Sequence, residues 1–261
     1  MLGIGNGLIY NAYLEDFSLA FHGLGTEDIM VIDDIQAILR GSWTINYWVR
    51  LNDSTPAPSA LNGYYNDSNN QLTFGIDQTG PNGSLIFKAD GTAVSINVSL
   101  DLDGSSGTLS GNSQSDWFMM TLTCTLDSSG SSASTFAMYS NANAISTNQT
   151  LAKAKHVAAD TGGLGFGFGA PNAAVHRLNG NMDEIAIWNT ALDADAVTAL
   201  YHSGLPLPAL VDSGNYDNSS NLVRYYTFNQ GVGTSVTDQT GNTNGTLSGS
   251  PVYSTDTPAT A

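Results

Sequence analysis

One stretch of the sequence, residues 177–204, combines a strand pattern with the clearest helix signal in a chain that otherwise consists of strands and turns. Residues 182–188 alternate Asp, Ile and Ile with Glu, Ala and Trp, and this period of two predicts a strand. Asp193 then offers a helix N-cap, and Gly204 offers a left-handed stop. Because so short a helix is unstable alone, it needs a sheet to pack on. The stretch therefore predicts an all-β fold with one short helix near residues 193–203.

The rest of the chain carries strand patterns at regular spacing. Residues 43–51 are the clearest of them, since every second residue is large and apolar and Trp48 falls on the opposite face from Trp43. Residues 52–70 contain two prolines and predict a long surface loop. In residues 162–169 small residues alternate with Leu and Phe, so we expect a neighbouring sheet to come close. Such runs, separated by Gly, Asn, Asp and Ser, are typical of a sandwich or jelly roll. Further strands are predicted at residues 71–76, 85–88, 94–100, 117–126, 135–139 and 164–168.

The charge balance excludes several partners. Only 11% of the residues are charged, yet the net charge is -16. Duplex binding needs a basic face, so nucleic acid is excluded as a partner, whereas divalent metals or polycations suit this charge. A run of about 18 apolar residues, the length of a membrane helix, occurs nowhere, and the amino terminus lacks the basic stretch of a signal peptide. We therefore expect neither membrane insertion nor export through a signal peptide.

Cys124 is the only cysteine in the chain, so no internal disulfide is expected. It falls in the predicted strand 117–126, on the same face as Phe118, Met120 and Leu122. This position predicts an inert core thiol.

Residues 177–204 resemble the closing segment of the laminin-G-like, concanavalin-A-like jelly-roll family. Residues 17–32 are similar to the opening strand of that family, although His22 stands where the family has Asp. Residues 222–252 are similar to a signature that precedes the opening strand in many members and comes last here. The resemblance implies a two-sheet antiparallel jelly-roll sandwich. The matching letters in the closing segment are Gly180, Met182, Asp183, Glu184, Ile185, Ile187, Trp188, Asn189, Ala191, Leu192, Val197, Leu200 and Tyr201.

The same resemblance divides the chain. We expect residues 17–203 to form the jelly roll, after an amino-terminal arm of residues 1–16 that packs on another subunit. Residues 204–221 are interrupted by prolines and predict a linker. Residues 222–261 then complete the sandwich and end in a tail, since a strand pair of this length would be only marginally stable alone.

Catalytic chemistry has little support in the sequence. Glucanases on the resembled scaffold place two Glu a few residues apart on one strand, whereas this chain has only Glu15, Glu27 and Glu184. The histidines show neither metal-ligand spacing nor a triad pattern. We therefore predict no catalytic residues and no enzyme, while an Asp pair assembled by folding stays open. The histidines are His22, His156, His176 and His202.

A structural calcium ion is the cofactor that the resemblance implies, because related sandwiches often tie the closing strand to the opening strand with a cation. Oxygen ligands suit Ca²⁺. Asp183 and Asp238 are the candidate metal ligands, with Asp28 as a third. The alternative is that Asp183 accepts hydrogen bonds from backbone amides without an ion, and both interpretations stay open.

Sugar recognition requires aromatic faces beside amide and carboxylate groups. Tyr64, Tyr65, Asn66 and Asp67 form such a group in the predicted loop, and Trp48 lies on the less apolar face of its strand. These are the candidate carbohydrate-binding residues. The alternative is that the aromatic side chains only contribute to packing.

Two functions follow as hypotheses. The first is a virion structural protein of a tailed phage, a capsid decoration or appendage subunit, because residues 1–7 and 212–231 resemble structural proteins of marine tailed phages. Its partners would be other virion proteins or further copies of itself in a homo-oligomer, and its location would be the virion after synthesis in the host cytoplasm. The second is a lectin-like, carbohydrate-binding adhesion module whose partner is a host surface glycan.

Overall fold

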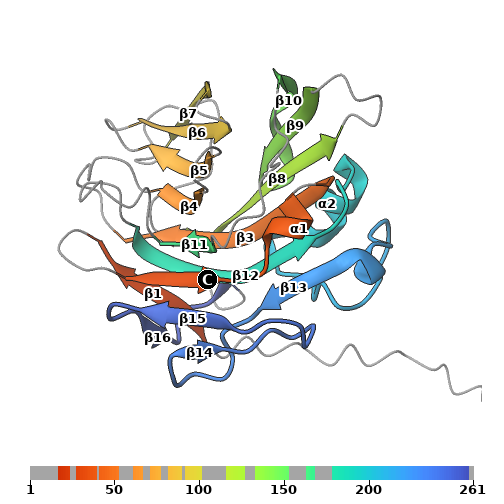
Figure 1. Ribbon diagram of the computed structural model, residues 1–261. Helices are drawn as coiled ribbons and strands as arrows, with labels where there is room; N and C mark the ends of the chain where they lie inside the picture. The colour runs from red at the N-terminus through yellow and green to blue at the C-terminus, as the bar shows by residue number, and fades with distance from the viewer. Residues whose placement is uncertain are drawn as a thin grey trace, which may run out of the picture.

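The computed structural model places the chain in two antiparallel β-sheets that face each other (Figure 1). This arrangement confirms the predicted all-β, two-sheet antiparallel sandwich. Sheet A contains, from edge to edge, β10 (Asn143–Ala152), β9 (Ala133–Ser140), β8 (Phe118–Leu126), β3 (Trp43–Leu51), β12 (Asn179–Trp188), β1 (Ser18–His22) and β16 (Val252–Ser254), with β13 (Leu222–Tyr226) also paired to β12. Sheet B contains β14 (Ser235–Val236), β15 (Gly245–Ser248), β2 (Ile29–Ile32), β11 (Leu164–Phe166), β4 (Leu61–Asn66), β5 (Gln71–Asp77), β6 (Asn82–Ala89) and β7 (Thr92–Asp101). The structure describes residues 17–23, 28–39, 41–52, 61–66, 71–77, 82–89, 92–101, 116–126, 133–152, 163–167 and 178–258.

The main core lies between the two sheets. It joins the apolar face of β3 to residues of sheet B such as Met30 and Phe166. Cys124 is 1% exposed within this core, so its predicted core position is confirmed, and burial raises the pKa of its thiol to about 12. The β3 residues that contribute are Trp43, Ile45, Tyr47, Val49 and Leu51, as their alternation predicts.

A second apolar cluster covers the outer face of sheet A, and we call it the outer cluster. It packs the helix α2 (Ala194–Tyr201) and the segment after it against sheet strands. Tyr216, in the stretch predicted as a linker, is fully buried there, where its hydroxyl accepts from Trp188 Nε1 at 2.9 Å and donates to the Ala209 carbonyl at 2.6 Å. The outer cluster therefore adds a third layer to the sandwich. Its members are Trp48, Trp117, Met119, Tyr139, Ala186, Trp188, Leu192, Ala196, Val197, Leu200, Leu207, Ala209, Tyr216, Leu222 and Tyr225.

Helix α2 begins as the sequence predicts and ends slightly earlier. The Asp193 carboxylate accepts from the Ala196 amide at 2.8 Å, which is the geometry of an N-cap. Left-handed backbone starts at His202 (φ 43) and Ser203 (φ 59), before Gly204 (φ 98). The helix therefore ends at two residues that have a Cβ, and Gly204 is the third residue in the left-handed conformation. A one-turn helix, α1 (Gln36–Leu39), and two 3-10 turns at 202–204 and 219–221 carry no clear signal in the sequence.

The strand β12 contains a bulge that its residue pattern hides. Glu184 has a positive φ of 50, and the register against β3 shifts between Asp183 and Ala186. Asp183 consequently lies opposite Trp48 on the outer face, and not with Ile185 on the core face as the simple alternation predicts. The bulge also marks a change of partner along one edge of β12, since β1 pairs up to Met182 and β13 pairs from Ile185.

The carboxyl-terminal segment contributes strands to both sheets. β13 pairs with β12 and β16 pairs with β1 in sheet A, whereas β14 and β15 extend sheet B beside β2. The chain therefore crosses the sandwich twice after β13 (Figure 1). This segment lies next to the strands that open the described part of the chain.

Two elements of sheets A and B differ from the sequence prediction. The expected loop of residues 52–70 contains the strand β4, which pairs with β11 on one side and β5 on the other. Its sequence, LNGYYN, lacks an apolar alternation, so pairing with neighbours distant in sequence decides its conformation. β10 likewise forms from a polar stretch beside β9.

The glycine-rich strand β11 has the close neighbours that its composition predicts. A Cβ on Gly167, where φ is 87, would lie 2.2 Å from the Phe21 ring of the opposite sheet. A Cβ on Gly163 would lie 2.5 Å from the Val31 side chain. Among the helices of the described part of the chain, none is long and apolar enough to span a membrane.

Candidate functional site

Asp238, a predicted metal ligand, is held by the turn that follows β14. It is 3% exposed, and it accepts hydrogen bonds from the amides of Tyr225 at 2.9 Å, Thr240 at 3.0 Å and Thr243 at 3.0 Å. The hydroxyl of Thr240 donates a further bond at 2.8 Å. Both carboxylate oxygens thus have protein donors, and their role in this structure is to fix the turn against β13.

Asp28, the third predicted ligand, links the end of β1 to the turn before β16. It accepts from the amide of Ser250 at 2.7 Å and from the amide and Nδ1 of His22 at 3.0 and 2.6 Å. Burial alone would raise the pKa of Asp28, but the hydrogen bonds from Ser250 and His22 and the charge of the imidazole outweigh it and lower the pKa below its ordinary 3.8. Asp28 is therefore an ionised carboxylate at neutral pH.

Asp183 lies at the bulge of β12 with no exposed surface. Its Oδ1 accepts from the amide of Glu184 at 2.8 Å, which is the kind of bond that the ion-free alternative invokes. The neighbouring Glu184 is 3% exposed and accepts from the Tyr225 hydroxyl. Two adjacent carboxyl groups are thus buried under the outer cluster.

These three carboxylates do not form one ligand set. Within the residues that the structure describes, no three His, Cys, Asp or Glu side chains come close enough to share a metal ion. The oxygens of Asp28 and Asp238 are instead occupied by amide and imidazole donors. Calcium at Asp183 or Asp238 alone stays a prediction.

Trp48, a predicted carbohydrate-binding residue, is only 2% exposed. Its ring stacks on Tyr201 of α2, with centroids 5.8 Å apart and an angle of 16° between the ring planes. The side chain does lie on the face of β3 opposite Trp43, but the helix packs over that face. Trp48 consequently offers no free ring to a sugar in this structure.

The tyrosine pair predicted for sugar binding lies in β4, at the middle of sheet B. Tyr64 is opposite Gly165 and Tyr65 is opposite the core residue Leu164 in the register with β11. Asn66 ends the strand, and Asp67 lies outside the described residues. The backbone therefore places the predicted residues on one central strand.

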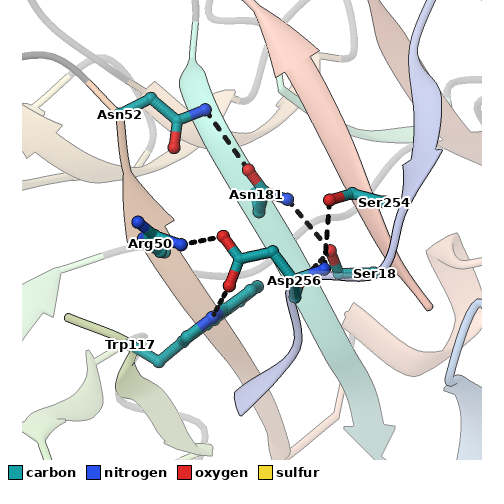
Figure 2. Close-up of polar contacts among 7 residues, drawn as sticks. All are labelled: Ser18, Arg50, Asn52, Trp117, Asn181, Ser254 and Asp256. Atoms are coloured by element: carbon teal, nitrogen blue, oxygen red, sulfur yellow. Dashed lines mark hydrogen bonds and ion pairs between the residues drawn. The ribbon is translucent and has the colours of Figure 1, made fainter. Parts of the chain in front are cut away.

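A polar cluster around Asp256, which the sequence did not indicate, lies on the outer face of sheet A (Figure 2). The Asp256 carboxylate forms an ion pair with Arg50 of β3 and accepts from Trp117 Nε1 at 3.0 Å. The backbone carbonyl of Asp256 accepts from the Ser18 hydroxyl at 2.6 Å, and that hydroxyl accepts from the side-chain amide of Asn181 at 3.0 Å. We call this group the Asp256 cluster.

Two further side chains extend the Asp256 cluster (Figure 2). The Asn52 side-chain amide donates to Asn181 Oδ1 at 3.3 Å, and the Ser254 hydroxyl accepts from the Asp256 backbone amide at 3.2 Å. The alternation of β3 does place Arg50 on the less apolar face. Nothing local in the sequence, however, pairs it with a residue that lies 206 positions away.

A family model described as the Concanavalin A-like lectin/glucanases superfamily matches residues 24–198. The chain belongs to this superfamily. The match runs from β2 to β12 and into α2, so it includes strands of both sheets, while β1 and β13 to β16 lie outside it. A search of curated proteins found no match to this chain.

Two solved structures show how the Concanavalin A-like fold recurs. A putative carbohydrate binding protein from Bacteroides ovatus is similar over 92% of this chain, with a TM-score of 0.54 and 14% identity. A heptameric SAP-like pentraxin from Limulus polyphemus is similar over 72% of this chain and 82% of its own, with a TM-score of 0.50 and 11% identity. This chain covers 59% of the length of the Bacteroides ovatus protein. At these identities the likeness shows the fold alone.

Proposed function

We propose that the chain is a non-catalytic, lectin-like carbohydrate-binding module. The observation that carries the proposal is its membership of a superfamily whose description names lectins and glucanases, matched over residues 24–198. The fold shared with a putative carbohydrate binding protein over 92% of the chain supports the lectin side of that pair.

Buried carboxylates favour binding over cleavage. Glycoside cleavage requires two carboxyl groups about 5 to 9.5 Å apart on either side of the scissile bond, both reached by the substrate. Glu184 is 3% exposed and engaged by Tyr225. Asp28, Asp183 and Asp238 are also exposed by 3% or less. Asp28, Asp183 and Asp238 accept backbone amides, so these four carboxyl groups are buried and serve the fold.

We assign the sugar site to β4, where Tyr64 and Asn66 remain candidate ligand residues, and Asp67, which follows the strand in the sequence, remains a third candidate. Residues directly opposite on adjacent strands share one face of a sheet. Tyr65 shares the face of the core residue Leu164, whereas Tyr64 shares the face of Gly165, which has no side chain. Of the two tyrosines we therefore assign Tyr64 to the sugar.

Testing the assignment starts from a glycan array of the full chain, with and without Ca²⁺, followed by titration of the best glycan. Tyr64→Ala should weaken binding about tenfold or more, because an aromatic contact is lost. The matched control is Tyr65→Phe, which keeps the ring at the core-facing register position and should leave the affinity unchanged. Melting curves of both variants report whether the fold persists.

A silent array under both calcium conditions would remove the proposed function. Binding that survives in Tyr64→Ala would instead leave the function standing and move the site away from β4. The virion role, with virion proteins or further copies of the chain as partners, stays a prediction that rests on the sequence resemblance. Mass spectrometry of purified particles tests it separately.

A further inference from the structure

The Asp256 cluster has the composition of a carboxylate receptor. Two donors of different chemistry converge on one carboxylate, since the Arg50 guanidinium pairs with Oδ2 and the Trp117 indole donates to Oδ1 at 3.0 Å. A guanidinium matches a carboxylate in shape and charge, and its bonds are stronger than those between neutral groups. Both donors lie on the outer face of sheet A, whereas β4 belongs to sheet B.

The ion pair of this receptor is partly open to solvent, whereas Trp117 is only 7% exposed. The side chains of Arg50 and Asp256 are 29% and 33% exposed. Arg50 Nε is buried and has no hydrogen-bond partner among the residues that the structure describes. The occupant follows β16, a three-residue edge strand that pairs only with β1.

We propose that Arg50 and Trp117 form a binding site for the carboxylate of a uronic acid, and that Asp256 fills this site as an intramolecular competitor. A tethered carboxylate acts at an effective concentration of roughly millimolar or above, so it displaces a weak free ligand. The segment that carries Asp256 thus blocks a site for acidic sugars.

Asn52 is the feature that favours a sugar acid over a plain anion. It follows β3, two residues after Arg50, so both lie on one side of that strand about 7 Å apart. Asn52 is exposed, and its amide already donates into the cluster through Asn181. An amide at that distance suits the ring hydroxyls of a sugar whose carboxylate sits on Arg50. This site goes beyond the β4 assignment and does not depend on it.

The experiment follows the indole N–H signal of Trp117 by NMR in the full-length chain, assigned by its loss in Trp117→Phe. Sodium glucuronate, sodium acetate and methyl glucoside are titrated into the parent protein and Asp256→Ala. We expect glucuronate to shift the signal in Asp256→Ala, with an affinity at least about tenfold higher than in the parent. Methyl glucoside should give no shift, and acetate should bind more weakly than glucuronate.

Two double variants isolate the parts of the site. Adding Arg50→Gln to Asp256→Ala should abolish the response, and adding Asn52→Ala should reduce glucuronate to the affinity of acetate. A folded Asp256→Ala chain whose indole signal stays fixed would overturn the proposal, as would equal affinity in the parent. Equal affinity for acetate and glucuronate in Asp256→Ala would overturn the sugar-acid assignment. Should Asp256→Ala fail to fold, Asp256→Asn removes the charge while keeping the size of the side chain, and it is titrated in the same way.

Discussion

Single buried carboxylates carry much of the local order in this sandwich, because each accepts hydrogen bonds from backbone amides of segments far apart in sequence. Asp28 ties β1 to the turn before β16, and Asp238 ties its turn to β13. Such bonds to an ionised acceptor contribute more than neutral ones and depend on pH.

Asp28→Asn should lower the free energy of unfolding at pH 7 by about 1 to 3 kcal/mol, because charge-assisted hydrogen bonds are weakened. The folded pKa of Asp28 lies below its ordinary 3.8. Its stabilisation is therefore present above that value and lost as pH falls through the lower, folded pKa. Urea unfolding between pH 7 and pH 3 should show the difference between parent and variant shrinking toward the acid end. Asp217→Asn, at an exposed position, is the control and should show no such trend.

Calcium is tested by Asp183→Ala and Asp238→Ala. Removing a buried carboxylate that accepts backbone amides should lower the melting temperature of each variant even without metal. If either residue holds calcium, added Ca²⁺ should raise the melting temperature of the parent and widen its gap to that variant. A gap that is unchanged by Ca²⁺ and by a chelator would leave both residues as hydrogen-bond acceptors only.

At the scale of elements, α2 depends on its cap and on its packing. Asp193→Ala should cost about 1 kcal/mol in urea unfolding, since the Ala196 amide loses its acceptor. Asp195→Ala, in the same first turn, removes only a favourable interaction with the helix dipole and should cost about half as much. Equal losses in the two variants would contradict the capping role.

The strand β11 requires glycine at its end for two separable reasons. Gly167→Ala combines a positive φ with a Cβ 2.2 Å from the Phe21 ring. Gly214 has a φ of 60, and a Cβ there would meet no atom of the described residues within 4 Å, so Gly214→Ala measures the backbone penalty alone. We expect Gly167→Ala to be destabilised by about 1 to 3 kcal/mol more than Gly214→Ala in the same unfolding assay. Similar losses would mean that Phe21 moves aside without cost.

Local signals in the sequence predicted the elements whose own residues decide their conformation. The alternation of β3, the core position of Cys124 and the Asp193 cap all agree with the structure. β4 was missed because its neighbours β11 and β5 supply its pairing. The bulge at Glu184 was missed because an apolar alternation does not show where a strand changes partner.

The Asp256 cluster was missed for a related reason. Its ion pair spans 206 positions, and no short-range pattern in the sequence connects the two residues. The burial of Trp48, a predicted sugar residue, was not foreseen, because the sequence showed an aromatic side chain on the outer face but not the helix that covers it. The family resemblance therefore predicted the fold, whereas the contacts of individual side chains could be known only from the structure.

At the scale of the whole molecule, the net charge of -16 opposes compaction. Raising NaCl from about 10 mM to about 150 mM shortens the screening length from about 30 Å to about 8 Å. The repulsion between carboxylates should weaken, so we expect the melting temperature to rise over this range. Because the partly exposed pair of Arg50 and Asp256 weakens with salt, Asp256→Asn should show a slightly larger rise than the parent. A melting temperature that falls with NaCl would mean that specific ion pairs outweigh the net charge.

The hydrogen bond of 2.6 Å between Ser18 and the Asp256 carbonyl brings the first and last strands of the described chain within reach of each other. β13 to β16 lie beside β1, β2 and β12, so the first and last strands of the described chain are neighbours in both sheets. Joining residues 17 and 258 by a short linker and cutting the chain at another surface turn should keep every described strand beside its present neighbours. We expect the signature that comes first in many resembling proteins and last here to form the same strands in a permuted order.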